Sequence, residues 1–315
     1  MLFIFLAILP VFILIAVGYG SVKFNYVPQS LGDALNAFAV KIAVPALLFR
    51  AMVNLDFETA LNLPALISFY TGAFSCFVLG IIIARKFFAR TPGEAVAVGF
   101  AATFSNSVLL GLPMVERYFG EETLTPAFGI IAFHASSIYI VGMMTMELMR
   151  RDGQPMSATL KKAGKSIIAN PLMLGILSGI TVNLLGIELF EPIMAAVGML
   201  AAAGIPAALV GIGASMTKYQ MGGSLPESLM VSFLSMIVHP LIALVLAHYI
   251  FELEPIFVHA LVTLACMPPG VNIYIFASMY NRAVNLAAST FLIATALSVV
   301  SITVWLYILS ILLPT

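Results

Sequence analysis

The residues of this sequence that could do chemistry are suited to binding a ligand. Asn106 stands between Ser105 and Ser107 in the stretch TFSNSVLLGLP, and Asn272 follows two prolines in the stretch CMPPGVNIYIF. Their amide and hydroxyl groups both donate and accept hydrogen bonds. The sequence contains none of the motifs H-E-x-x-H, G-x-S-x-G and C-x-x-C, which mark common metal, nucleophile and redox sites. We therefore expect ligand recognition, with no enzyme activity, no metal and no cofactor.

The composition places these residues in a membrane. The chain has 315 residues, of which 62% are hydrophobic and 9% charged, and its mean hydropathy is +1.09. A water-soluble protein needs more polar surface than this. Long apolar runs favour helices, because strands of a membrane barrel read as alternating segments of about 10 residues. The net charge is zero, so we expect no nucleic-acid partner. Cys76 and Cys266 lie in apolar runs and are expected to be inert thiols.

Breaks at Gly, Pro and charged residues divide the chain into ten apolar stretches. Each is close to the roughly 20 residues that cross a bilayer as a helix. The first lacks a basic segment and a cleavage site, so we keep it as a helix of the mature protein. The predicted helices are 2–20, 31–53, 63–85, 94–118, 125–149, 166–187, 191–215, 227–251, 255–281 and 287–313.

The distribution of Lys and Arg predicts the orientation in the membrane. Basic residues gather in cytoplasmic loops. The odd-numbered loops hold eleven of them and the even-numbered loops hold only Arg117. We therefore predict that the odd loops are cytoplasmic and that both termini lie outside. The eleven residues are Lys23, Arg85, Lys86, Arg90, Arg150, Arg151, Lys161, Lys162, Lys165, Lys218 and Arg282.

The long hydrophilic connection 151–165 separates two halves, 1–150 and 166–315, with five predicted helices each. Because the number per half is odd, equivalent helices cross the bilayer in opposite directions, as in an inverted repeat. Short landmarks match at a near-constant offset, such as AVPALL with Pro45 and GIPAAL with Pro206. The sequence thus predicts an all-α integral membrane protein with ten transmembrane helices arranged as two inverted five-helix repeats.

The same offset aligns the two polar stretches, TFSNSVLLGLP in the fourth predicted helix and CMPPGVNIYIF in the ninth. Both fall near the middle of the bilayer. Proline removes a backbone donor and frees carbonyls that lipid cannot satisfy, so such breaks persist only inside protein or beside a cavity. A single break is commonly a structural kink. Paired breaks in inverted halves favour a transporter substrate site.

At these residues the sequence resembles the auxin efflux carrier family, whose bacterial members include proposed malonate and organic anion transporters. The likeness covers essentially the whole chain and rests on the ten-helix layout, the segments SNSVLLGLP and PPGVN, and the Pro45 and Pro206 landmarks. It implies that the fourth and ninth helices unwind and cross.

The resemblance also implies how the helices are divided. The first, second, sixth and seventh helices would form a scaffold, and the others a transport domain with an elevator-like motion. The related bile-acid sodium symporters share that crossed arrangement. The resemblance also implies a multi-pass protein of the bacterial inner membrane.

Three basic residues, Lys41, His134 and His239, lie deep in predicted helices. Lys41 is near the middle of the second, where a lysine costs at least about 2.5–3.5 kcal/mol. It is either a counter-charge for an anionic substrate, or a group that pairs with backbone carbonyls or extends toward the membrane interface. His134 in the fifth is the candidate for a proton relay, and its alternative role is a hydrogen bond to a neighbouring helix. No Asp or Glu lies deep in a predicted helix. Tight sodium coupling is therefore less expected than uniport or proton linkage.

The predicted substrate-binding residues follow from the two breaks. For the asparagines the alternative role is capping of the half-helices. The full set is Ser105, Asn106, Ser107, Pro113, Pro268, Pro269, Asn272 and Lys41.

The function that these features favour is secondary active or facilitated transport of small organic anions. Malonate is the first candidate and an auxin-like carboxylate the second. Alternatives are a sodium-coupled symporter of the bile-acid type and an anion channel. The stretch GILSG, Gly175–Gly179, has the spacing of a close helix contact, which serves either internal packing or a homodimer.

Overall fold

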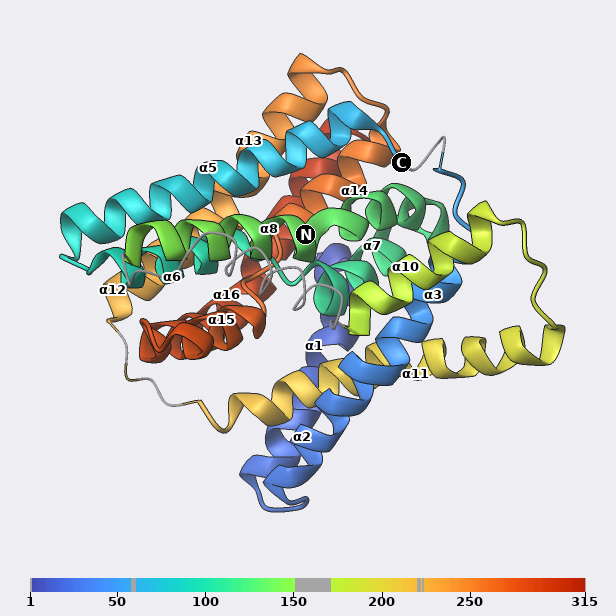
Figure 1. Ribbon diagram of the computed structural model, residues 1–315, viewed down its shortest axis with the longest axis horizontal. Coiled ribbons are helices and arrows are strands. Elements are labelled where there is room, and N and C mark those ends of the chain that lie inside the picture. Colours follow the sequence, from blue (N-terminus) through green and yellow to red (C-terminus); the bar gives the residue numbers. More distant parts are fainter. Residues whose placement is uncertain (1, 58–60, 151–170, 220–221, 223, 315) are drawn as a thin grey trace. The chain divides into compact units, whose positions relative to one another are not determined.

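The computed structural model describes residues 2–57, 61–150, 171–219, 222 and 224–314, and these ranges are built from helices (Figure 1). The predicted connection 151–165 and the first residues of the sixth predicted helix, 166–170, lie outside the described residues. Within the described residues, all ten predicted stretches are helical. The boundaries differ from the prediction by a few residues, because caps and last turns carry weak sequence signals.

The helices are labelled as in Figure 1. Short π-helical and 3₁₀ segments (η) interrupt or precede several of them. In chain order they are α1 (Leu2–Lys23), α2 (Gln29–Phe38), η1 (Ala39–Ala43), α3 (Val44–Val53), α5 (Leu63–Phe87), α6 (Pro92–Thr103), η2 (Ser107–Gly111), α7 (Leu112–Phe119), η3 (Glu121–Thr123), α8 (Leu124–Arg150), α10 (Pro171–Leu184), α11 (Glu191–Met216), α12 (Leu225–Phe233), η4 (Leu234–Val238), α13 (His239–Leu244), η5 (Val245–Ile250), α14 (Pro255–Ala265), α15 (Asn272–Tyr280) and α16 (Val284–Leu312).

Seven helical stretches among the described residues are long and apolar enough to cross a membrane. Two further apolar helices, Pro171–Leu184 and Pro255–Ala265, are shorter. The second of these ends at a break in its helix. The described chain is therefore consistent with an all-helical integral membrane protein.

The chain forms two compact units. One unit consists of Leu9–Ala60 and Gly164–Lys218, and the other of Met1–Ile8, Leu61–Ala163 and Tyr219–Thr315. The first, which we call the small unit, contains α2, η1, α3, α10, α11 and most of α1. These are the first, second, sixth and seventh predicted helices, the group that the family resemblance implied for a scaffold. The second, which we call the large unit, contains the remaining helices.

Close glycine contacts hold the small unit together. Gly175 and Gly179 of α10 lie against the backbone of Pro45 and Phe49 in α3, so a Cβ atom at either glycine would collide with that backbone. The GILSG stretch therefore serves internal packing, one of its two predicted uses. Asn183 of α10 donates to the carbonyls of Met52, Val53 and Leu55 at 2.8–3.0 Å and so satisfies the end of α3.

The broken helices form the core of the large unit. Residues 95–105, which run from α6 into the first break, are all buried. Residues 258–270, which run from α14 into the second break, are buried as well. Irregular backbone is tolerated at membrane depth only where protein or a cavity surrounds it. Burial inside the large unit therefore meets the condition under which the two breaks can persist.

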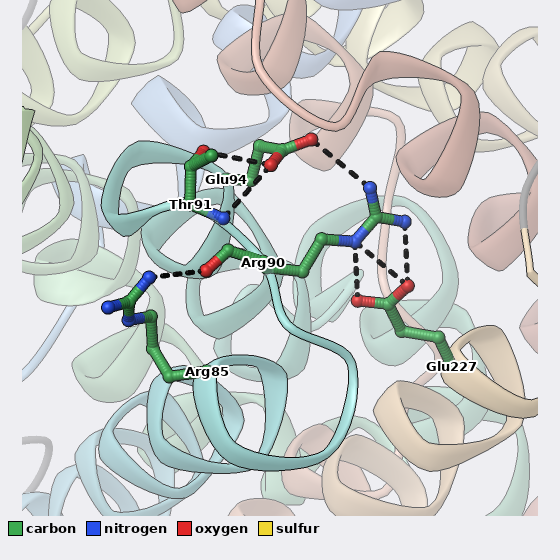
Figure 2. A network of polar contacts seen from close by, with 5 residues as sticks. All are labelled: Arg85, Arg90, Thr91, Glu94 and Glu227. Atoms are coloured by element: carbon green, nitrogen blue, oxygen red, sulfur yellow. Dashed lines mark hydrogen bonds and ion pairs between the residues drawn. The ribbon is translucent and has the colours of Figure 1, made fainter.

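A polar network joins the segment before α6 to α12 (Figure 2). Arg90 precedes α6, and its guanidinium binds the carboxylate of Glu227 in α12 through contacts of 2.7–3.1 Å. It also binds Glu94, which completes a capping box with Thr91 at the start of α6. Only 1% of the Glu227 side chain is exposed. Hydrogen bonding to Glu227 raises the pKa of Arg90 above its ordinary value, so the guanidinium stays charged.

Candidate functional site: the crossing of two broken helices

The first break follows α6, which ends at Thr103. No proline lies in the break itself. Instead Ser105, Asn106 and Ser107 follow one another, and such residues compete for backbone hydrogen bonds through their side chains. The hydroxyls of Ser105 and Ser107 are 2.7 Å apart and hydrogen-bonded. The helix resumes in a π-helical turn, in which the N–H groups of Leu110 and Gly111 both donate to the carbonyl of Asn106.

The second break follows α14, which ends at Ala265. Pro268 and Pro269 have no backbone N–H, and proline disfavours helical conformation in the residue before it. Helix α15 then begins at Asn272. The sequence prediction of a break in each of these two helices is therefore confirmed by the backbone.

The two breaks bind each other through their backbones. Ser105 and Pro269 form an antiparallel bridge. The N–H of Asn106 donates to the carbonyl of Pro268 at 2.9 Å, and the N–H of Gly270 donates to the carbonyl of Phe104 at 3.3 Å. A Cβ atom at Gly270 would lie 3.3 Å from Cβ and Cγ of Asn106. Glycine at this position therefore lets the two segments approach closely.

Side chains from two other helices satisfy further carbonyls of the breaks. Nε2 of His134 in α8 lies 3.1 Å from the carbonyl oxygen of Ser105, and the hydroxyl of Ser235 in η4 donates to the carbonyl of Met267 at 3.5 Å. His134 is buried. It thus makes the hydrogen bond to a neighbouring segment that was the alternative to proton transfer, and the proton relay stays a prediction.

The two asparagines lie at the crossing without capping a helix. Asn106 precedes η2 but makes no side-chain cap hydrogen bond. Asn272 is the first residue of α15, and no side chain caps that helix. Instead Oδ1 of Asn272 accepts a hydrogen bond from the hydroxyl of Tyr139 in α8 at 3.2 Å. Both asparagines are half-buried. The capping role therefore does not account for them, and their amides remain reachable by a ligand.

An aromatic cluster adjoins the amide of Asn272. Phe100 of α6 and Phe276 of α15 stack with ring centroids 3.8 Å apart and planes within 5°. The ring of Tyr139 packs edge-on against Phe100 at 5.2 Å and against Phe104 at 5.5 Å. The crossing thus places hydrogen-bonding groups beside an apolar wall, a combination typical of small-molecule sites.

Two predicted site residues lie elsewhere. Pro113 is buried at the second position of α7, after the π-helical turn, so it starts a half-helix and takes no part in the backbone bridge. Lys41 belongs to the small unit, in η1, where its side chain is exposed. Among the described residues, no group of three or more His, Cys, Asp or Glu could hold a metal ion.

Sequence reasoning missed Tyr139 and the aromatic cluster. Phe100 and Phe104 are four residues apart, within α6 and just after it, and Phe276 is four residues after Asn272. Side chains at this spacing share one face of a helix. That periodicity was the available signal, although it also describes ordinary packing.

Comparison with known proteins adds a family match over nearly the whole chain. The family model described as "Membrane transport protein" matches residues 3–306. A protein of Rhizobium meliloti described as a "Putative malonate transporter" is 24% identical over 302 residues, which cover 96% of this chain and 94% of that protein. An uncharacterized transporter of Methanothermobacter thermautotrophicus is 24% identical over 306 residues, covering 96% and 97%. The uncharacterized transporter YfdV of Escherichia coli K12 is 24% identical over 319 residues, covering 96% of each chain.

Proposed function

Because the chain belongs to the membrane transport protein family that includes the auxin efflux carriers, we propose that it is a secondary transporter of small organic anions. Its substrate binds where the two broken helices cross. The observation that carries this proposal is the pair of half-buried asparagine amides at the joined breaks. Inside a membrane, amide N–H groups can donate hydrogen bonds to an anion, and the ends of half-helices offer it partial positive charges.

The proposal includes an inverted repeat of five plus five helices, 1–150 and 166–315, and alternating access by movement of the large unit. The two breaks in corresponding predicted helices support the repeat. The compactness of each unit supports movement of one against the other. The outside termini rest on the Lys and Arg bias, and the inner membrane location and a homodimer rest on the family resemblance alone.

For the substrate we propose a dicarboxylate such as malonate, which the description of the Rhizobium meliloti relative supports. An aromatic, auxin-like carboxylate is the second candidate, which the cluster around Phe100, Tyr139 and Phe276 supports. For coupling we propose uniport or proton linkage through His134. The carbonyl of Ser105 can only accept a hydrogen bond, so Nε2 carries the N–H, and Nδ1, which has no hydrogen-bond partner within the described part of the chain, is the nitrogen that would take a second proton.

Ligand-dependent stabilisation of the purified protein tests the function. A ligand that binds only the folded state raises the apparent stability, by about 2.7 kcal/mol at a concentration of 100 times its Kd. We expect carboxylates to raise the midpoint of thermal unfolding equally in sodium and in choline buffers. Stabilisation by amines or sugars alone would contradict an anion carrier. A carboxylate effect that requires sodium would favour the sodium-coupled symporter, and carboxylate flux without saturation or counterflow would favour the channel.

Replacing Lys41 with Met is expected to lower carboxylate uptake into proteoliposomes by roughly tenfold or more, because the counter-charge predicted for the anionic substrate is lost, and an interaction with a charged group contributes about 1.5–3 kcal/mol. The unfolding midpoint should change little, since the side chain is exposed in the small unit. Lys23→Met is the matched control, because Lys23 is also exposed and lies at the end of α1 in the same unit. Equal uptake by the two variants would contradict a role for Lys41 as a counter-charge for the substrate.

A further inference from the structure

An asparagine at an anion site can either favour or oppose its ligand. Its carbonyl oxygen accepts hydrogen bonds and its NH₂ group donates two, whereas an ionised carboxylate only accepts them. An asparagine supports carboxylate binding only when the NH₂ group faces the ligand. The opposite orientation presents an oxygen, which repels a carboxylate but can still accept from the NH₂ group of a carboxamide. With the NH₂ group facing the ligand, the hydrogen bond to a carboxylate is charge-assisted and therefore stronger than the bond to the carbonyl oxygen of a carboxamide. Whatever fixes the orientation of the Asn272 amide therefore contributes to the choice of substrate.

Tyr139 supplies that orientation. Its hydroxyl donates to Oδ1 of Asn272 at 3.2 Å. No hydrogen bond within the described part of the chain uses the amide nitrogen of Asn272. The carbonyl oxygen of this amide is thus hydrogen-bonded to Tyr139, and its NH₂ group is available to a ligand.

The ring of Tyr139 is held in place by its neighbours. It meets Phe100 of α6 at an interplanar angle of 63°, and Phe104, the residue that follows α6, at 75°. It also meets Phe276, with ring centroids 6.3 Å apart. Phe276 lies four residues after Asn272 on α15, so the helix that carries the amide also carries one of the rings that hold its partner. The hydroxyl therefore approaches Oδ1 from a fixed direction.

We propose that Tyr139 is a positioning residue that turns the Asn272 amide so that its NH₂ group faces the substrate, which makes the site select carboxylates over carboxamides. This inference rests on the proposed function, since it requires that the crossing binds a carboxylate. Beyond the proposed function, it names the residue that sets the substrate preference, and it states that preference as carboxylate over carboxamide.

The test is Tyr139→Phe, which keeps the ring and removes the hydroxyl. Uptake is measured for malonate against malonamate, in which one carboxylate is a carboxamide, and for phenylacetate against phenylacetamide. The wild-type protein should prefer the carboxylate of one pair. In Tyr139→Phe we expect the KM for that carboxylate to rise by roughly three- to tenfold, the effect of one hydrogen bond. The maximal rate should stay near wild type, and the carboxamide should lose nothing. The carboxylate-to-carboxamide preference then falls by the same factor.

Tyr70→Phe is the matched control. The Tyr70 hydroxyl donates to the carbonyl of Ile130 at 2.8 Å, so this variant loses a similar hydrogen bond without touching Asn272. Its preference ratio should equal that of the wild type. In an Asn272→Ala background, adding Tyr139→Phe should leave the ratio unchanged, because the two residues act as one unit.

The outcomes separate the two proposals. Wild-type protein that binds neither malonate nor phenylacetate would overturn the proposed function and this inference with it. Carboxylate transport with an unchanged ratio in Tyr139→Phe would overturn the inference alone. Equal losses for carboxylate and carboxamide would also overturn it, because they would show that the hydroxyl only supports the fold.

Discussion

Arg90→Ala is expected to destabilise the protein by about 3–5 kcal/mol, because removing one partner of a buried ion pair leaves the other charge without compensation. The partner left behind is the Glu227 carboxylate, whose side chain is 1% exposed. Arg90 makes all of the hydrogen bonds to that carboxylate that the described residues provide. The measurement is the unfolding midpoint in detergent, compared with the wild-type protein.

Two variants make this prediction specific. Arg85→Ala removes a neighbouring exposed arginine that, among the described residues, donates to the backbone carbonyl of Arg90 alone, so its effect should stay within about 0.5 kcal/mol. The double variant Arg90→Ala with Glu227→Ala should be more stable than Arg90→Ala alone, since it no longer buries an unpaired charge. A double variant that is less stable than Arg90→Ala would contradict this account of the pair.

The ion pair between Arg90 and Glu227 also has a consequence for movement during transport. Arg90 joins the segment before α6 to α12, and α6 leads directly into the first break. The ion pair therefore fixes the start of a helix whose other end supplies half of the crossing. If the large unit moves during transport, this pair helps it to move as one body, because neither helix can shift without exposing or separating the two charges.

The sequence was sufficient for features that depend on nearby residues. Long apolar runs indicated helices, and the structure has helices in all ten stretches among the described residues. Pro268 and Pro269 marked the second break through the missing donors. The Ser105, Asn106 and Ser107 stretch marked the first, where short polar side chains replace helical hydrogen bonds. The matching position of the two breaks then indicated that they act together.

The missed features depend on residues far apart in the chain. Tyr139 and Asn272 are separated by 133 residues, and Arg90 and Glu227 by 137. A tyrosine in an apolar stretch is usually a packing residue, and a glutamate at the start of a predicted helix is usually solvated. Neither pattern indicates its partner. Packing of both α8 and α15 against α6, and of α12 against α6, brings these groups within hydrogen-bond distance.

Asn272→Asp is expected to lower carboxylate uptake by roughly 100-fold or more, because a like charge facing an anion costs several kcal/mol. The new side chain has nearly the same shape, and its oxygen can still accept the hydrogen bond from Tyr139. The fold should therefore persist, with an unfolding midpoint near that of the wild type. Initial uptake into proteoliposomes at pH 7, with and without a competing carboxylate, measures the effect.

Protonation gives this prediction an internal control. Lowering the pH neutralises the introduced carboxyl group and should restore part of the uptake in Asn272→Asp, an effect absent from Asn272→Ala. Asn62→Asp is the matched substitution elsewhere in the large unit, where Oδ1 of Asn62 caps α5 by accepting from the N–H of Ala65. Aspartate caps a helix as well as asparagine does, so uptake should be unchanged. If Asn272→Asp transports carboxylates as well as Asn62→Asp does, the amide at the crossing does not face the substrate, and the site must lie elsewhere.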